Sequence, residues 1–521
     1  MRFSLLLHTV WHLKIKQILY QVKHRFVNPK IDNLVLYHDN ESNLNYVDFI
    51  EKYRCISDST NFTFLNILSR YKSWNCTSNG MLWAYNLNYM DWLGQEGLTF
   101  AEGERWIDLF INDLPNNRVG LDPYPIALRS INWVKFICQH YNEISEEKQK
   151  IWNDSLYSQV KLLERKLEYH LLGNHLLEDL YALFVASLYF HDETLFDKIS
   201  RKLMKELDEE VLSDGMHYEQ SPMYHCILLD RLLDCYNFSL HNALFEKQNK
   251  VNSFLLGKAQ KMLGHLSTMV YADGSIPLLN DSALGIAPTA QQLFAYAKRL
   301  NISYEAMPLE ECGYRKFKND CFESVVDVGD ILASYQPGHS HADTFNFELR
   351  IDGKPFIVDS GISTYNKTVR RQYERSTAAH NTVTINDKDS SEVWGGFRIG
   401  KRARVYIEED TPNKIIAEHN GFGRLGKHKR SFAFSEKDFV ISDSISSNNE
   451  GTARFHLAPQ ISVVSNTSST VVTTMAQLQF HGALNIKIIK GKISERYNMF
   501  REIDIIEVKF KNNLVTEILH E

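Results

Sequence analysis

The chain has 521 residues, of which 44% are hydrophobic and 23% are charged, values typical of a folded globular protein and too apolar for disorder over most of the length. A chain this long exceeds what one hydrophobic core usually serves, so two domains are expected. The net charge of -6 argues against a nucleic-acid-binding protein, and the seven cysteines, which form no CxxC pair, argue against a disulfide framework or a cysteine zinc site.

The N-terminal segment is basic and carries an apolar stripe. The stripe repeats at steps of three and four residues, the spacing of an amphipathic helix: Trp11, Ile15, Ile18, Val22 and Phe26. No small-residue cleavage site follows it, so we expect no cleaved signal peptide. Two interpretations are open for residues 1–27: the helix packs on the body of the protein, or it makes a peripheral contact with a membrane. No later segment reaches the apolar length of a transmembrane helix.

Helical periodicity dominates residues 46–300. Apolar residues recur at helical spacing in segments that short polar or glycine-containing turns separate. These segments are 152–172, 175–190, 195–212, 223–238 and 259–270. Many helices with short connections predict antiparallel helical hairpins.

After about residue 302 the pattern changes to short strand-like runs, many of them bounded by glycine, asparagine, aspartate and serine. The runs include 331–335, 345–351, 382–385, 404–407, 439–442, 486–489 and 503–510. They predict a C-terminal antiparallel β-sandwich. We therefore divide the chain into an N-terminal amphipathic helix and linker (1–45), a helical domain (46–310) and a β domain (311–521).

Two histidines stand just before one of the predicted strands. Residues i and i+2 of a strand point to the same face, so His339 and His341 are placed to converge on one metal ion or one substrate. Asp359 closes the next apolar run, and His380 opens another. A histidine, an aspartate and a histidine at successive strand ends are plausible ligands of one zinc ion.

Asn174 and His175 stand at the start of a strongly helical segment. A helix N-terminus has free backbone N–H groups that suit an anion. The alternative is that Asn174 only caps the helix.

A second polar cluster, residues 214–225, contains Tyr218, Glu219 and Tyr224. It contains two tyrosines, two histidines and a glutamate, more polar and aromatic side chains than a turn in the core requires. A phenol becomes a useful acid or base only if its surroundings match its high intrinsic pKa to the reaction. The alternative is that Tyr224 is a packing residue.

A third cluster combines arginines with aromatic residues, and clustered arginines favour carboxylates and sulfates through bidentate hydrogen bonds. It includes Tyr365, Arg370, Arg371, Tyr373 and Arg375, and the loop with Trp394 and Arg398 follows it. Of these we take five as candidate substrate-binding residues, together with Tyr218 and Glu219: Tyr365, Tyr373, Arg375, Trp394 and Arg398. A solvated charged loop and a plain turn are the alternatives.

In their chain order, these motifs resemble those of the heparinase II/III family of polysaccharide lyases, and they are similar to those of the related alginate and oligoalginate lyases. The motifs are Asn174-His175, the loop 214–225, His339-Ser340-His341-Ala342-Asp343, Asp359-Ser360-Gly361 and Ala379-His380-Asn381-Thr382. The likeness covers most of the chain. It implies that the helical domain is an (α/α) toroid and that the β domain is the C-terminal sandwich of that family.

The resemblance also implies a reaction. These lyases cleave next to a uronic acid by β-elimination, removing the C5 proton and expelling the C4 oxygen, which requires a donor on the carboxylate, a base and an acid. On this basis Asn174 matches the neutralising asparagine, and His175 beside it assists. Tyr224 matches the tyrosine that acts as acid, or as both base and acid, with Tyr218 as the local competitor. His339 matches the histidine that faces the cleft.

The metal ligands follow from the same resemblance. His341, Asp359 and His380 match ligands of a divalent metal, commonly zinc, which shapes the site and need not activate water. The implied partner is an acidic polysaccharide or oligosaccharide. The likeness extends to family members associated with bacterial capsule or O-antigen production. We therefore expect a location in the bacterial cell envelope, in the periplasm by family resemblance, with a cytoplasmic or membrane-peripheral location left open by the N-terminal segment.

Two other classes of function remain open. A glycoside hydrolase on the same toroid would use a pair of carboxylates, for which the chain offers Glu178, Asp179, Glu219, Asp273 and Asp281. A non-catalytic glycan-binding or assembly protein of a bacterial surface polysaccharide pathway would use the same cleft without turnover.

Overall fold

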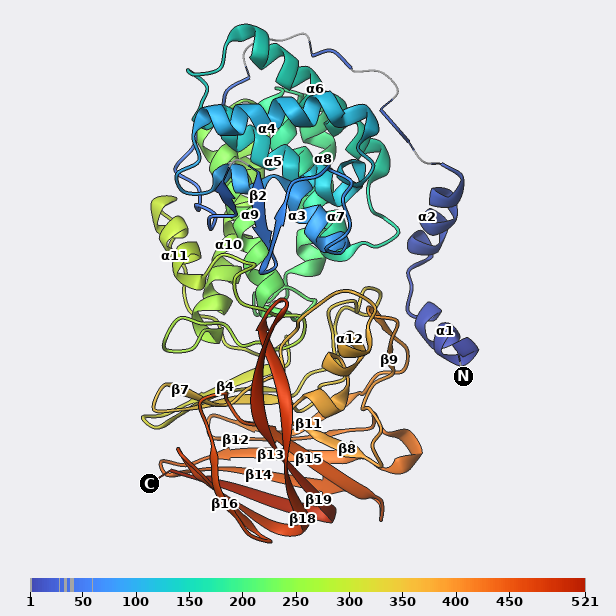
Figure 1. Ribbon diagram of the computed structural model, residues 1–521, viewed down its shortest axis with the longest axis vertical. Coiled ribbons are helices and arrows are strands. Elements are labelled where there is room, and N and C mark those ends of the chain that lie inside the picture. Colours follow the sequence, from blue (N-terminus) through green and yellow to red (C-terminus); the bar gives the residue numbers. More distant parts are fainter. Residues whose placement is uncertain (1, 28, 32–34, 38–41, 59, 521) are drawn as a thin grey trace.

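A computed structural model of the protein describes residues 2–27, 29–31, 35–37, 42–58 and 60–520. Its N-terminal part is a toroid of helices, and its C-terminal part is built from antiparallel β-sheets below the toroid (Figure 1). This arrangement confirms the predicted α+β fold class. The last toroid helix ends at Arg299 and the first strand of the sandwich begins at Tyr314.

The toroid helices pack in consecutive pairs, such as α7 with α8 and α9 with α10, and also in pairs two apart in the sequence, such as α5 with α7. They are α3 (Met81–Tyr89), α4 (Phe100–Asp113), α5 (Pro123–Gln139), α6 (Glu146–Lys166), α7 (Gly173–Tyr189), α8 (Glu193–Glu210), α9 (Pro222–His241), α10 (Gln248–Met269) and α11 (Ala290–Arg299). A small antiparallel sheet that the sequence did not predict precedes them: β1 (Ile56–Asp58), β2 (Asn61–Phe64) and β3 (Ile67–Arg70).

Helix α7 lies inside the toroid. Every residue of this helix except His175 is buried, as expected for a helix that is apolar on all sides. It packs against α5, α8 and α9, so its position is fixed by neighbours on several sides. The backbone enters α7 through Leu172 and Gly173, which both have positive φ. A Cβ atom on Gly173 would lie only 2.6 Å from Glu219 Oε1, so this turn requires glycine.

The sandwich has two main sheets, and their strand pairs are antiparallel. A four-stranded sheet contains β4 (Tyr314–Lys318), β5 (Phe322–Asp327), β6 (Phe347–Ile351) and β7 (Lys354–Ile357). The larger, ten-stranded sheet contains β8 (Val383–Ile385), β11 (Val405–Thr411), β12 (Lys414–His419), β13 (His428–Phe434), β14 (Asp438–Ile445), β15 (Glu450–His456), β16 (Val463–Asn466), β17 (Thr470–Thr473), β18 (Gln477–Arg496) and β19 (Met499–Leu519). One apolar core is shared by both sheets.

The remaining elements lie on the side of the sandwich that faces the toroid (Figure 1). They are the short helix α12 (Val369–Glu374) and the two-stranded sheet of β9 (Val393–Trp394) and β10 (Arg398–Ile399). The run 331–335, predicted as a strand, is irregular chain. Its backbone bonds to the toroid instead of a neighbouring strand, since Leu332 N donates to Gln220 Oε1 over 2.9 Å.

The long hairpin of β18 and β19 rises from the sandwich to the toroid (Figure 1). At its tip, Asn66 Nδ2 donates to Tyr497 O over 2.8 Å and Asn498 Nδ2 donates to Leu65 O over 2.9 Å. The hairpin therefore joins the two domains at a point far from the covalent linker between them.

Two N-terminal helices, α1 (Arg2–Val10) and α2 (Ile15–Phe26), lie on one flank of the molecule (Figure 1). Gln17 anchors α2, because its Nε2 donates to Leu171 O and to Tyr335 O over 3.0 and 3.1 Å. Trp394 Nε1 donates to Thr9 Oγ1 over 3.1 Å and anchors α1. Within the residues that the structure describes, no helix is long and apolar enough to cross a membrane. Met1 and several linker positions of the predicted segment 1–45 lie outside the described residues.

We expect Gly361→Ala to lower the free energy of unfolding by about 3 kcal/mol, because Gly361 has a positive φ and a Cβ atom there would lie 2.2 Å from Ser494 O. Gly353→Ala is the matched control, since Gly353 also has a positive φ but open space around it, and should cost about 1 kcal/mol. Urea denaturation measures both. Equal losses of unfolding free energy in the two variants would contradict a steric conflict between residue 361 and Ser494 O.

Candidate active site

A cavity of about 660 Å³ lies where the toroid, the loops of the sandwich and the N-terminal helices meet. Its volume suits a small molecule or a few sugar units. Four residues predicted to be catalytic line it: Asn174, His175, Tyr224 and His339. The aromatic part of the wall includes Tyr89, Tyr124, Tyr365, Phe397 and Tyr497. The sequence-based grouping of these distant motifs therefore corresponds to one place in the fold.

Asn174 lies in the first turn of α7 and is buried. Its backbone N–H donates to Glu219 Oε1 over 3.0 Å, which fixes the turn. Its side-chain oxygen has no hydrogen-bond partner among the described residues. An amide held in a cavity wall with unused hydrogen-bonding capacity can receive a polar group of a ligand.

His175 follows on the one face of α7 that is not buried. Its Nδ1 lies 3.1 Å from Glu168 Oε2. Burial opposes the charged imidazolium, but the Glu168 carboxylate outweighs it, so the pKa of His175 is raised above its usual range. The raised pKa favours the protonated form of this ring beside Asn174.

Tyr224 and His339 form a stacked pair across the domain junction. Tyr224 lies in the first turn of α9, and its ring centroid is 3.9 Å from that of His339 with an interplanar angle of 28°. Tyr365 OH donates to Tyr224 OH over 3.2 Å. Burial raises the pKa of the Tyr224 phenol, and the hydrogen bond from Tyr365 partly opposes that shift. The phenol is therefore protonated at neutral pH.

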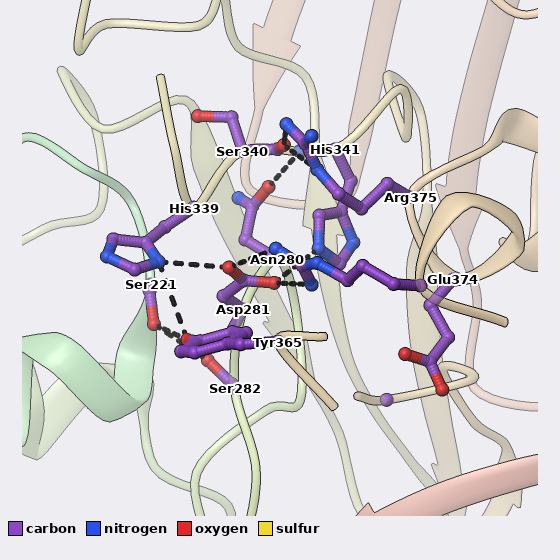
Figure 2. A network of polar contacts seen from close by, with 12 residues as sticks. Ser221, Asn280, Asp281, Ser282, His339, Ser340, His341, Tyr365, Glu374 and Arg375 are labelled. Carbon is purple, nitrogen blue, oxygen red and sulfur yellow. Dashed lines mark hydrogen bonds and ion pairs between the residues drawn. The ribbon is translucent and has the colours of Figure 1, made fainter. Parts of the chain in front are cut away.

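Asp281 holds the centre of the site (Figure 2). Its Oδ2 lies 2.9 Å from His339 Nδ1 and its Oδ1 lies 2.8 Å from His341 Nε2. Arg371 approaches the same carboxylate with both terminal nitrogens, Nη2 at 2.7 Å from Oδ2. Although burial opposes ionisation, Arg371 and the two rings hold the pKa of Asp281 well below its usual range. One buried aspartate thus orients both histidines of the His339-Ser340-His341 motif.

Glu219 is buried behind the cavity wall, next to Asn174 and His339. It accepts the Asn174 N–H, and its Oε2 lies 3.5 Å from His339 Nε2. Burial raises the pKa of this carboxyl group. Glu219 therefore connects the asparagine and the histidine of the site, although it does not line the cavity itself.

The other predicted substrate-binding residues have different placements. Tyr365 and Arg398 line the cavity. Tyr218 is buried behind the wall, next to the Tyr335 ring. Trp394 binds Thr9 of α1 and stacks under Arg398.

Tyr373 and Arg375 do not reach the cavity. The guanidinium of Arg375 is fully buried and donates to Ser340 O over 2.8 and 3.2 Å. Arg375 thus supports the backbone between His339 and His341 and has no access to a ligand.

Two of the predicted metal ligands, His341 and His380, each have one ring nitrogen without a hydrogen-bond partner among the described residues. His341 Nδ1 and His380 Nε2 are buried without a hydrogen-bond partner among the described residues, and so is Asp343 Oδ2. Ligand atoms of these three residues lie within 4.8 Å of one another. Asp359 lies on the other side of His380, with its Oδ2 2.8 Å from His380 Nδ1. Its two oxygens also accept from Asn346 Nδ2 and Gly361 N.

This donor set fits a divalent metal ion, because unpaired buried nitrogen and carboxylate atoms that face one another are costly without one. The geometry favours Asp343 as the carboxylate ligand and gives Asp359 the outer role of orienting His380. Sequence analysis did not single out Asp343 as a ligand, although it lies two residues after His341 and the same spacing rule applied to it.

The carboxylates considered for a glycoside hydrolase do not line the cavity. None of Glu178, Asp179, Glu219, Asp273 and Asp281 lines the cavity. Asp281 is neutralised by Arg371, and Asp273 binds Arg350 on the surface. Of the described residues, the acidic ones in the wall are Asp91 and Asp230, and Asp230 is paired with Lys52 at 2.9 Å.

Two residues of the site, Tyr497 and Asp281, were not predicted for the lyase site from the sequence. Tyr497, at the tip of the β18–β19 hairpin, lines the cavity and packs edge-on against Tyr365 with centroids 5.5 Å apart. Asp281 was noted only as an available carboxylate. The turn residue Asn498, with positive φ, marks a hairpin tip in the sequence, but no local signal shows where that tip lies.

The architecture of the chain is a helical toroid joined to an antiparallel sandwich, with a cavity lined by aromatic, aliphatic and polar side chains at the junction. Sequence profiles identify it further: residues 132–302 match the heparinase II/III N-terminus and residues 302–520 match the heparinase II/III-like C-terminal domain. The chain belongs to the heparinase II/III family.

Individual relatives agree with this assignment. The chain is 24% identical over 353 residues to a heparin-sulfate lyase of Bacteroides stercoris, a match that covers 61% of this chain and 50% of the relative. Matches to heparin-sulfate lyases of Bacteroides thetaiotaomicron and Pedobacter heparinus, at 23% and 24% identity, cover 48% and 36% of this chain and 40% and 31% of those proteins. The chain thus spans half or less of the length of these curated relatives.

Solved structures support the fold. A crystal structure of heparinase III superposes with a TM-score of 0.67 at 16% identity, covering 83% of this chain and 76% of that one. The heparan sulfate lyase HepC of Pedobacter heparinus superposes with a TM-score of 0.56 at 17% identity, covering 87% of this chain and 79% of that one.

We expect Asp281→Asn to lower the free energy of unfolding by about 3 to 5 kcal/mol, because it leaves the buried Arg371 guanidinium without its counter-charge. Asp273→Asn serves as the control, since the Asp273 side chain is half exposed in its ion pair with Arg350 and should cost about 1 kcal/mol or less. Chemical denaturation compares the two variants. Similar losses would show that the Asp281 network does not stabilise the fold.

Proposed function

We propose that this protein is a polysaccharide lyase that cleaves a uronic-acid-containing glycan by β-elimination. The observation that carries the proposal is the convergence of Asn174, Tyr224 and His339 on one cavity between the two domains. These three residues provide an amide, a phenol and an imidazole, the groups that such a reaction needs. The names of the curated relatives, which are heparin-sulfate lyases, support the same class.

The first requirement of the reaction is a more acidic C5 proton. The proton is weakly acidic while the neighbouring carboxylate carries its full negative charge, because removing it would place a second negative charge beside the first. The side-chain N–H groups of Asn174 and the His175 ring, whose raised pKa favours its protonated form, would donate to that carboxylate and spread its charge.

The second requirement is a base and an acid. Asp281 orients the His339 ring through Nδ1, and Nε2 of the same ring, which lies 3.5 Å from Glu219 Oε2, is the nitrogen that would accept the C5 proton. Tyr224 carries its phenolic proton at neutral pH and donates it to the departing C4 oxygen. The C5 electron pair forms the C4–C5 double bond as the C4–O bond breaks, so no water is consumed.

The substrate is proposed to be an acidic polysaccharide or oligosaccharide, such as a glycosaminoglycan or a bacterial surface glycan. The cavity wall contains several aromatic rings, which stack well on sugar faces. Arg398 lies in the wall with its guanidinium 4.8 Å from the Trp394 ring centroid. An exposed guanidinium is suited to a carboxylate or sulfate group of the chain. We retain the cell envelope as the proposed location.

We expect the purified protein to convert a uronate polymer to a product with an unsaturated, ultraviolet-absorbing end. Tyr224→Phe should reduce the rate by about a hundredfold to ten-thousandfold, because it removes the acid while the ring still stacks on His339. Tyr406→Phe is the matched control, since Tyr406 is 69% exposed on the sandwich and should keep full activity. Absorbance assays over heparan sulfate, alginate, hyaluronan and bacterial capsules measure all three proteins.

The outcomes separate the three classes of function. A saturated non-reducing end on the product would identify hydrolysis and replace the lyase proposal. Binding of a uronate polymer without turnover would identify a non-catalytic glycan-binding protein. Full activity of Tyr224→Phe would remove the acid role from Tyr224.

We also propose that a divalent metal ion, zinc, binds to His341, Asp343 and His380. Support comes from the unpaired and mutually close ligand atoms of these residues. When bound, zinc would fix the two rings and the turn that carries His339. This chain's own residues still perform the proton transfers.

Asp343→Asn should abolish stoichiometric zinc and lower the thermal unfolding midpoint, whereas Asp359→Asn should retain most of the metal at reduced affinity. The difference follows from the positions of the two carboxylates, one among the ligand atoms and one behind His380. Elemental analysis of the purified proteins and thermal unfolding with and without a chelator provide the readouts. If Asp359→Asn loses the metal and Asp343→Asn keeps it, Asp359 is the ligand, as the sequence resemblance implied.

A further inference from the structure

The outer face of the N-terminal helices is unusually apolar for a protein surface. Along α2 the large apolar side chains exposed to solvent follow helical spacing and continue into α1: Leu7, Trp11, Ile15, Ile18, Leu19, Val22 and Phe26. Trp11, Ile15 and Phe26 are 87%, 76% and 83% exposed. A continuous apolar stripe of this kind on a surface marks an interaction site. We call these seven residues the outer stripe.

The inner face of the same helices already has its partners. Lys14 pairs with Glu209, and His8 Nδ1 lies 2.9 Å from Glu392 Oε2. The Gln17 side chain is buried and bonds the two domains' backbones. Because the polar inner face is fixed to the body of the protein, the outer stripe cannot turn inward without breaking these contacts.

The charge of this segment differs from that of the whole protein. Residues 1–31 contain six lysines and arginines and no aspartate or glutamate, in a chain whose net charge is -6. Five of the six have exposed side chains in the structure: Lys14, Lys16, Lys23, Arg25 and Lys30. Lys14 pairs with Glu209 and Lys16 lies over the Tyr169 ring, so the cations that flank the outer stripe are those at the C-terminal end of α2 and just after it, Lys23, Arg25 and Lys30.

We propose that the outer stripe docks on an anionic lipid bilayer, with the α1 and α2 helices lying in the plane of the membrane surface. An apolar stripe flanked by lysine and arginine is the arrangement that inserts shallowly among acyl chains while the cations meet anionic headgroups. A second copy of the protein is a poorer partner, because a symmetric contact would bring this basic face against itself.

Docking in this way has a consequence for the cavity. Leu6 and Val10 of α1, Gln21 of α2 and Leu13 between the two helices line it. The membrane surface and the cavity would therefore share a wall, and the cavity would open beside the bilayer. This interaction surface is independent of whether the cavity is catalytic.

The test is sedimentation of the full-length protein with vesicles of phosphatidylglycerol and phosphatidylcholine, compared with vesicles of phosphatidylcholine alone. We expect binding to the anionic vesicles that weakens as salt is raised. The triple variant Trp11→Ser, Ile15→Ser, Phe26→Ser should bind at least about tenfold more weakly, since it removes the most exposed part of the outer stripe.

The matched control removes equally exposed apolar side chains from the sandwich side. Val369→Ser, Tyr406→Ser, Val464→Ser changes residues that are 89%, 69% and 66% exposed and should bind like the wild-type protein. Circular dichroism should show the same thermal unfolding for both triple variants and the wild type, because the substituted side chains are exposed.

Three results would overturn the proposal. The first is wild-type protein that stays in the supernatant with anionic vesicles at low salt. The second is equal weakening in the control variant, which would indicate non-specific adsorption. The third is self-association without lipid that disappears in the outer-stripe variant and no vesicle binding, which would make the face an interface between copies.

Discussion

The site depends on one buried aspartate. Asp281 comes from the segment that follows the toroid helices α9 and α10, whereas His339, His341 and Arg371 come from segments leading into and out of the sandwich strands. A single carboxylate therefore links the two domains and fixes the tautomers and orientations of two rings at once. Its charge is acceptable in the interior because a guanidinium and two ring nitrogens surround it.

Much of the fold follows from periodicity alone, and the exceptions have local causes. Helix α6 begins at Glu146, before the predicted start at residue 152, because Ser145 accepts the Lys148 N–H and caps the helix earlier. The run 331–335 has the composition of a strand but bonds to Gln220 of the toroid. The sequence pattern indicates the secondary structure that a segment prefers, but contacts with the rest of the protein can override that preference.

The site was predictable where motif order carried the information. Asn174, Tyr224 and His339 came from that order and meet in the cavity. The choice between Arg371 and Arg375 was not predictable, since the two residues are one helical turn apart and have the same chemistry. Packing alone directs Arg371 to Asp281 and Arg375 to a backbone carbonyl.

The β18–β19 hairpin supplies part of the cavity wall and a second attachment between the domains. The domains are held together at the covalent linker and again at the hairpin tip, where Tyr497 and Asn498 bond to the toroid loop of Asn66 and Leu65. A body held at two separated points resists hinge rotation about either one. With the Asp281 network as a third connection, the relative position of the two domains, and with it the shape of the cavity between them, is set by the fold.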